Sequence, residues 1–342
     1  MEKTKQILFV FTGGTIASRI HKKALELGTA PYTLLETAKK APGSFDIIEP
    51  ISVFSENITP EMYRVLFGAI GKAFSPAKHC GIMIAHGTDT MAYTAQLANL
   101  FFSKYTVPVV LFGSKRPLDD PRSDARANFK AALGLVSSVD KGVYVVGQAS
   151  DKKVYVHHAG WVQSADVRTD DFSSFRNRFA GKIVRGAFVP NPDFKEPPVF
   201  PAASSALSKI KKLSALPTER TVLCIPASCC TGYEIYQIGM PSFRYVLVQP
   251  YHSGTANALS EDNPFSLLFL KKACDSKEKR VYLGPCDIEK PLYSTSQALR
   301  EAGITPIPDM PFETAWAILM LCTWLGIDPD KFLRIAFPNR NE

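Results

Sequence analysis

A short apolar run that leads straight into a polar turn and then into a helical pattern constrains this fold more than any other stretch. Residues 81–85 (GIMIA) are apolar enough for a strand buried on both faces, and from Met91 onward apolar residues recur at helical spacing. The polar turn between them, HGTDT at residues 86–90, would lie at the carboxyl end of a parallel strand. Open α/β sheets bind ligands at that edge. We therefore expect a parallel sheet that presents Thr88 and Asp89 at this strand end.

A second stretch near the N-terminus has the same construction. Residues 6–11 (QILFVF) predict a strand, and the turn TGGT at residues 12–15 follows it. Because glycine adopts positive φ and allows another group to approach the backbone, Thr15 could be presented in a tight pocket. A single Thr or Asp in such a turn is usually a helix cap. Two turns of this kind on separate strands, with Ser55 and Glu56 ending a third, favour a shared cleft.

The remaining pattern predicts two α/β domains. Strands at residues 47–53, 107–112 and 142–147 alternate with helices, as in a doubly wound, mostly parallel sheet, and residues 153–158 and 172–188 predict antiparallel additions. Five prolines between residues 189 and 201 exclude a helix or a central strand. A second alternation of strand and helix starts at residue 221. We therefore assign residues 1–188 to an N-terminal domain, 189–217 to a proline-rich linker and 218–342 to a smaller α/β domain; 342 residues exceed what one core usually fills.

The charge and the cysteines indicate the setting in which the chain acts. The net charge of +8, from 40 basic and 32 acidic residues, could indicate a nucleic-acid partner. The basic residues are scattered, however, and are not interleaved with aromatic residues, so nucleic-acid binding is not expected. The number of cysteines, seven, is odd, and Cys229-Cys230 lacks the spacing of a metal site. No apolar segment is long enough for a bilayer and no cleavable signal pattern is seen, so we expect no membrane association and a reduced, cytoplasmic setting.

Together, the two turns resemble a known family. TGGTIAS at residues 12–18 and HGTDTMAYTA at residues 86–95 are similar to the two signature motifs of the L-asparaginase family, the Thr-nucleophile amidohydrolases. GSKRPL at residues 113–118, with Ser123-Asp124 and Asn128, resembles that family's third strand end, and residues 302–315 resemble its C-terminal segment. The start without a signal peptide resembles the cytoplasmic type I branch. The resemblance implies a two-domain asparaginase-like fold with a Rossmann-like C-terminal domain.

The resemblance also implies a role for each residue of the turns. A carboxamide is unreactive, so cleavage needs a nucleophile, a proton acceptor and donors aimed at the developing oxyanion. Thr15 would be the attacking hydroxyl, and Tyr32 would stand beside it on a mobile flap. Thr88 and Asp89 would supply the second hydroxyl and the carboxylate, and Asp89 would also face the α-ammonium group. The remaining substrate-binding positions are Gly14, Ser55, Glu56 and Gly87, and the resemblance implies no metal and no organic cofactor.

The family's catalytic lysine has no counterpart in this chain. An alignment without gaps onto Asp171 and Phe175 puts Asp166 at the lysine position, and a deletion of two residues would put Arg168 there instead. A second carboxylate beside Asp89 would raise one pKa, and an arginine could not act as a base. The segment around Cys286, which contributes to an effector site in type I enzymes, is shortened.

Three functions remain open from the sequence. The first is an amidohydrolase that cleaves L-asparagine to L-aspartate and ammonia; asparagine and glutamine differ by one methylene, which the sequence does not resolve. The second is a descendant that binds an amino acid as a sensor without turnover. The third is the amidase subunit of a tRNA-dependent amidotransferase. Such subunits carry an extra N-terminal domain, whereas the first strand here starts at Gln6. Because a neighbouring subunit completes the pocket in this family, we expect a homodimer or homotetramer.

Overall fold

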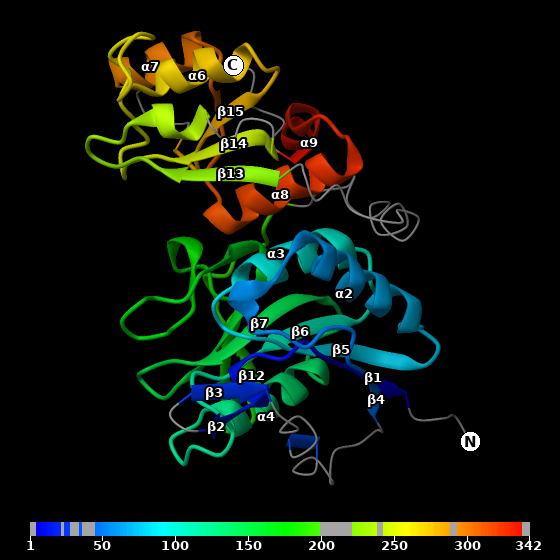
Figure 1. Ribbon diagram of the computed structural model, residues 1–342. Helices are drawn as coiled ribbons and strands as arrows, with labels where there is room; N and C mark the ends of the chain where they lie inside the picture. The colour runs from blue at the N-terminus through cyan, green and yellow to red at the C-terminus, as the bar shows by residue number, and fades with distance from the viewer. Residues whose placement is uncertain are drawn as a thin grey trace. The chain divides into compact units, whose positions relative to one another are not determined.

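The computed structural model describes residues 5–21, 24–27, 34–35, 45–198, 221–237, 242–287 and 293–336. The chain divides into two compact units, Met1–Leu216 and Pro217–Glu342, both of which are α/β (Figure 1). Tyr32, the expected flap residue, and most of the expected linker lie outside the described residues.

The first unit is built on an eight-stranded mixed sheet with the order β12-β11-β8-β7-β6-β5-β1-β4. Its parallel strands are β1 (Gln6–Phe11), β4 (Phe45–Ile48), β5 (His79–Ala85), β6 (Pro108–Phe112) and β7 (Gly142–Gln148). The antiparallel strands are β8 (Val154–His158), β11 (Gly181–Val184) and β12 (Ala187–Pro190). This arrangement confirms the predicted doubly wound sheet and its antiparallel additions. The strand predicted at residues 47–53 already ends at Ile48, because Pro50 has no N–H to give to a ladder.

Helices cover both faces of this sheet. They are α2 (Pro60–Ala73), α3 (Met91–Phe102) and α4 (Ala125–Val136), and Figure 1 shows α2 and α3 on the face opposite α4. Helix α2 begins where the sequence places a cap, because the Thr59 side chain accepts a hydrogen bond from Met62 N and Pro60 occupies the first turn. Under α4, the buried rings of Phe9, Phe112 and Phe129 pack together.

Short elements complete the first unit. They are η1 (Thr15–Ala17), β2 (Ser18–His21), β3 (Ala24–Leu27), η2 (Ser55–Asn57), η3 (Ala159–Trp161), β9 (Val162–Gln163), β10 (Ser173–Ser174) and η4 (Phe175–Asn177). Residues 191–198, which the sequence analysis assigns to the linker, are tied to this unit. Asn191 Nδ2 donates to Phe179 O at 2.9 Å, and Trp161 Nε1 donates to Lys195 O at 2.5 Å.

The second unit has a four-stranded parallel sheet with the order β13-β14-β15-β16. The strands are β13 (Thr221–Pro226), β14 (Phe243–Gln249), β15 (Arg280–Leu283) and β16 (Thr305–Pro306), and the helices are η6 (Tyr233–Gln237), α6 (Leu267–Asp275), α7 (Ser294–Glu301), α8 (Phe312–Leu325) and α9 (Pro329–Ala336). Helix α8 is apolar over most of its surface and packs on β13 and β14. No helix of the described residues is both long enough and apolar enough to cross a membrane.

Candidate active site

The turns that follow β1 and β5 are in direct contact. The two strands are parallel neighbours, and Thr12 Oγ1 donates to Ala85 O at 3.0 Å where they end. Gly14 has a φ of +78°, and a Cβ on it would lie 2.5 Å from Gly87 N and 2.6 Å from Gly87 Cα. Only a glycine allows this approach. Thr15 and Thr88, the next residues of the two turns, are therefore carried on touching segments.

A third turn, η2, completes this cluster of strand ends. Gly14 N donates to Val53 O at 3.0 Å, and Thr90 Oγ1 donates to Ser55 O at 2.9 Å. The Ser55 side chain lies against Gly87, is 3% exposed, and its hydroxyl has no hydrogen-bond partner among the described residues. A buried hydroxyl without a partner is unfavourable, so this atom is suited to a ligand oxygen.

Three carboxylates meet beside these turns. Partial burial raises the pKa of Asp89, and the charges of Glu56 and Asp170 raise it further, as does a hydrogen bond between the Asp89 and Glu56 side chains. Glu56, Asp89 and Asp170 are all exposed. Because a hydrogen bond between two carboxyl groups needs a proton, Asp89 retains its proton to a higher pH than an isolated aspartate does.

A buried hydrogen-bond chain holds the turn after β5. His86 Nδ1 lies 2.7 Å from Gly87 O, His86 Nε2 lies 2.9 Å from Thr94 Oγ1, and that oxygen lies 3.2 Å from Tyr63 Oη. Burial lowers the pKa of His86 to about 4, so the ring is neutral near pH 7. A carbonyl oxygen can only accept, so Nδ1 carries the proton and Nε2 accepts from Thr94. The chain of hydrogen bonds fixes the peptide that leads into Thr88.

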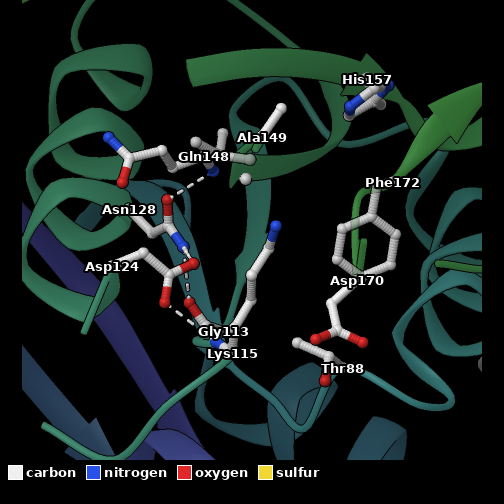
Figure 2. A pocket seen from close by; sticks show the side chains of 12 residues that line it. Thr88, Gly113, Lys115, Asp124, Asn128, Gln148, Ala149, His157, Asp170 and Phe172 are labelled. Carbon is white, nitrogen blue, oxygen red and sulfur yellow. Dashed lines mark hydrogen bonds between the residues drawn. The ribbon is translucent and has the colours of Figure 1, made fainter. Parts of the chain in front are cut away.

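A small cavity lies between Thr88 and the ends of β6 and β7 (Figure 2). Its volume of about 10 Å³ is close to the space that one water molecule needs. Asn128 braces its wall, because Asn128 Nδ2 donates to Asp124 Oδ2 and to Gly113 O at 2.9 Å, and its Oδ1 accepts from Gln148 N at 2.8 Å. The cavity shares Lys115 and Asp170 with a wider hollow of about 680 Å³. The cations that line the hollow are Lys115, Arg116, Arg122, Lys152 and Arg168.

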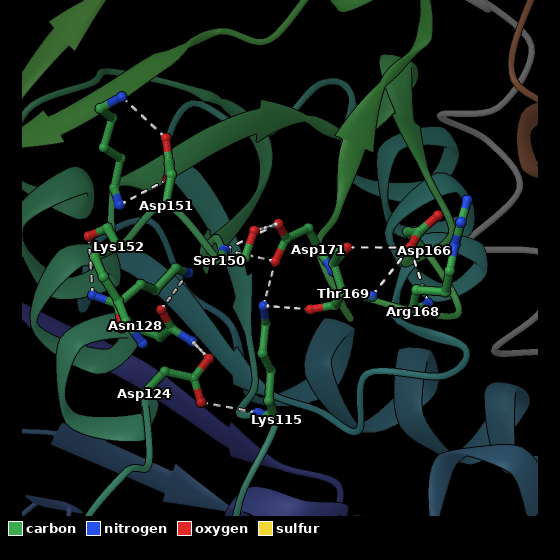
Figure 3. Close-up of polar contacts among 12 residues, drawn as sticks. Lys115, Asp124, Asn128, Ser150, Asp151, Lys152, Asp166, Arg168, Thr169 and Asp171 are labelled. Carbon is green, nitrogen blue, oxygen red and sulfur yellow. Dashed lines mark hydrogen bonds and ion pairs between the residues drawn. The ribbon is translucent and has the colours of Figure 1, made fainter.

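Neither of the two positions considered for the family lysine lines the small cavity with Thr88. Figure 3 shows Asp166 and Arg168 together in the loop that leads to Thr169 and Asp171. Asp166 is exposed, and its Oδ1 accepts from Arg168 N at 2.9 Å and from Thr169 N at 3.1 Å, so it organises its own loop. Arg168 is exposed and lines the wider hollow but not the small cavity. Lys115 and Asp170 line the small cavity with Thr88 instead.

Sequence reasoning did not single out Lys115 or Asp170 as site residues. Lys115 follows the end of β6 by three residues, which is the signal that could have found it, because that strand end belongs to the same edge as Thr88. Asp170 sits in an irregular loop and carries no comparable signal. Among the residues that the structure describes, no three His, Cys, Asp or Glu side chains gather closely enough to hold a metal ion.

Several known proteins resemble this chain in sequence. The model of the N-terminal domain of asparaginases matches residues 6–191. The D subunit of the glutamyl-tRNA(Gln) amidotransferase of Pyrococcus furiosus is 36% identical over 325 residues, which cover 92% of this chain and 71% of that protein. The protein of the same name from Thermococcus kodakarensis is 37% identical over 190 residues, which cover 53% of this chain and only 43% of the relative.

Solved structures show the same fold over nearly the whole chain. A probable cytoplasmic L-asparaginase from Campylobacter jejuni superposes with a TM-score of 0.75 at 24% identity, covering 97% of this chain and 98% of its own. The thermostable L-asparaginase from Thermococcus kodakarensis gives a TM-score of 0.72 at 21% identity, with coverage of 97% and 96%. The matched family model, the shared fold and the two touching turns agree, and the chain belongs to the asparaginase family.

Proposed function

We propose that this chain is an amidohydrolase that releases ammonia from the side-chain carboxamide of free L-asparagine or L-glutamine. The observation that carries the proposal is the close approach of Gly14 and Gly87, because Thr15 and Thr88 directly follow these two glycines and Asp89 comes next in the second turn. Thr15 is the proposed nucleophile and Thr88 the second hydroxyl. Family membership and the asparaginase fold support this chemistry.

The surrounding groups suit an amino-acid substrate. The buried Ser55 hydroxyl, which has no partner in the described part of the chain, is the proposed contact of the α-carboxylate. The exposed carboxylates of Asp89 and Glu56 would face the α-ammonium group, since opposite charges attract. The N-terminus of α3 directs the positive end of its dipole toward the same turn. All seven cysteines are free thiols, which supports a reduced, cytoplasmic setting.

Ammonia release from a panel of amides tests the proposal. Thr15→Ala and Thr88→Ala should each lower kcat at least about 100-fold, because each removes a hydroxyl that takes part in nucleophilic attack or proton transfer. Thr106→Ala is the matched control. Thr106 is exposed and precedes β6, at the end of the sheet opposite to the candidate site, so ammonia release by this variant should be unchanged. Full activity in Thr15→Ala would contradict the assignment. If asparagine raises the melting temperature of the wild type while no ammonia appears, the chain is an amino-acid sensor.

The names of the curated relatives favour one physiological context. The D subunit of glutamyl-tRNA(Gln) amidotransferase is the name shared by relatives that match 92% and 98% of this chain. We therefore propose that the released ammonia is used to amidate glutamyl-tRNA(Gln) with a partner protein, in preference to free-standing asparagine breakdown. The scattered basic residues gave no reason to expect a nucleic-acid partner from the sequence, and it is the names of the relatives that favour tRNA here. Binding of tRNA that weakens between 50 and 200 mM salt, with faster ammonia release in its presence, is expected. Ammonia release that ignores glutamyl-tRNA(Gln), without tRNA binding, would favour the free-standing enzyme.

A further inference from the structure

We propose that Asp170 is the proton acceptor for the Thr88 hydroxyl and takes the place that the family's lysine would have. The proposal rests on the proposed function, because Thr88 needs a proton acceptor only if it takes part in amide cleavage. Asp170 lies four residues beyond Asp166, the position that the alignment gives to the lysine.

The placement of Asp170 supports this role. Thr88 and Asp170 line the same small cavity, and Figure 2 shows the Asp170 carboxylate directed to the side of the cavity that Thr88 occupies. The charge of Asp170 also acts on Asp89, the residue next to Thr88. Among the described residues, the Asp170 carboxylate has no hydrogen-bond or ion-pair partner. An unpaired carboxylate beside a reactive hydroxyl is free to accept its proton.

The residues on both sides of Asp170 are anchored to the sheet (Figure 3). Lys115 Nζ, three residues beyond β6, donates to Thr169 O at 3.0 Å and forms an ion pair with Asp171. Ser150 N and Oγ, beyond the end of β7, donate to Asp171 Oδ2 at 3.0 and 2.7 Å. Because Thr169 and Asp171 are both held, the Asp170 side chain between them has a defined position.

The loop itself forces an unusual backbone at Asp170. Asp170 N donates to Asp166 O at 2.8 Å, and Asp166 N donates to Asp171 O at 3.0 Å. Within this closed turn Asp170 has a φ of +56°, in the left-handed region. Such a conformation is unfavourable for a residue other than glycine and persists only where the surroundings impose it, which is common at functional sites. Aspartate and asparagine tolerate it better than most residues, so Asp170→Asn is a conservative test.

The proposed transfer leaves Asp170 unchanged at the end of each half-reaction. As Thr15 attacks the carboxamide carbon, its proton passes to Thr88 Oγ1, and Thr88 passes its own proton to an Asp170 oxygen, directly or through one water in the cavity. When the carbon–nitrogen bond breaks, Asp170 returns its proton to Thr88 and Thr88 gives a proton to the leaving nitrogen, which departs as ammonia and leaves an ester on Thr15. Water then attacks the ester in the same way, and the acid and the free Thr15 hydroxyl are restored.

Charged groups from several elements surround Asp170. Those that line the same hollows are Lys115, Arg116, Asp120, Arg122 and Asp124 from the segment between β6 and α4, Lys152 after β7, and Arg168 of its own loop, while Asp89, on which Glu56 also acts, feels the charge of Asp170. His157 of β8 also lines the cavity, but burial lowers its pKa to about 4, so it is uncharged near pH 7. Removing the Asp170 charge should therefore lower the pKa of Asp89 toward its ordinary value.

The test compares the wild type with Asp170→Asn and Asp151→Asn. Asp151 is a neighbouring exposed carboxylate that lines neither hollow, so its variant controls for the loss of one negative charge. For Asp170→Asn we expect kcat for ammonia release to fall about 100-fold or more, with KM changed less than about threefold. The kcat that remains in the variant should decline at a lower pH than the kcat of the wild type does, because the pKa of Asp89 drops. Asp151→Asn should change neither value.

Thermal melting at several pH values gives a second readout that needs no activity. A raised pKa in the folded state means that folding loses stability as the pH rises through that pKa, so the wild type carries this loss near pH 7. The melting temperature of Asp170→Asn minus that of the wild type should therefore be more positive at pH 7 than at pH 4. Lys153 lowers the pKa of Asp151, so Asp151→Asn should show the opposite trend.

Each result decides the proposal. The proposal is supported if the wild type is active, Asp170→Asn is weakened, the decline of kcat at low pH (the acid limb) is displaced, and the melting temperatures follow the expected trend. An active wild type whose Asp170→Asn variant keeps more than half of its kcat, or loses kcat without any change of the acid limb, overturns the role of Asp170 alone. A melting difference that does not vary with pH overturns it too, since Asp170 would then not face Asp89. A wild type that releases no ammonia from any amide overturns the proposed function together with this role.

Discussion

The contact between Gly14 and Gly87 can be broken by adding a single methyl group. In Gly14→Ala the new Cβ would lie 2.5 Å from Gly87 N, which is backbone and cannot rotate away, and the residue would keep a φ of +78°. The left-handed conformation costs an L-residue about 1–2 kcal/mol. Overpacking adds about 1–3 kcal/mol. We expect the free energy of unfolding to fall by about 2–5 kcal/mol, and ammonia release to fall sharply because the turns of Thr15 and Thr88 separate.

Two other glycines separate these two contributions. Gly186 has a φ of +83° but a Cβ would meet nothing within 4 Å, so Gly186→Ala should show only the conformational cost of about 1–2 kcal/mol. Gly68 lies inside α2 with nothing within 4 Å, so Gly68→Ala should stabilise by about 0.5–1 kcal/mol. Thermal melting should register about 2–4 °C per kcal/mol for a unit of this size. If Gly14→Ala melts no lower than Gly186→Ala and stays active, the two turns do not touch and the site has been assigned wrongly.

Two further predictions follow from buried polar groups. Ser55→Ala should leave the free energy of unfolding unchanged or raise it by about 1 kcal/mol, because it removes a buried hydroxyl without a partner in the described residues. The KM for the amino-acid substrate should rise about 10- to 100-fold, because the contact with the α-carboxylate is lost. An unchanged KM would show that the α-carboxylate binds elsewhere. Burial lowers the pKa of His86, His157 and His158 to about 4, so these rings stay neutral in the folded protein while they charge in the unfolded chain below about pH 6.5. The free energy of unfolding should therefore fall as the pH drops from about 6.5 to 4, by an amount on the order of 3 kcal/mol per ring. A melting temperature that does not change across this pH range would show that the rings are not buried as described.

The alternation of apolar runs and helical patterns was sufficient to predict the sheet, because burial on both faces leaves few other folds for such runs. The strands predicted at residues 107–112 and 142–147 correspond to β6 and β7, which pair in parallel as expected. Errors arose where a local feature interrupts the pattern. Pro50 ends β4 early, although Val53 still pairs with Gly13 in an isolated bridge. Residues 191–198 are rich in proline and yet pack on the first unit, because proline excludes ladders and helices but does not exclude side-chain contacts.

The candidate site shows a sharper limit of sequence reasoning. Thr15, Ser55 and Thr88 could be grouped from the sequence alone, because the carboxyl ends of neighbouring parallel strands must meet at one edge. Asp170 could not, because its loop has no periodicity and its direction depends on Lys115 and Asp171, which are 56 residues apart. An alignment counted from Asp171 reaches Asp166, whose side chain closes its own turn. Counting along the chain therefore gives Asp166, whereas the cavity that Thr88 lines contains Asp170, the proposed replacement, which carries the opposite charge to a lysine. If Asp170 is the proton acceptor, the group that takes the proton is an acid and not an amine, so the pH dependence of catalysis should differ from that of an enzyme that uses a lysine at this place.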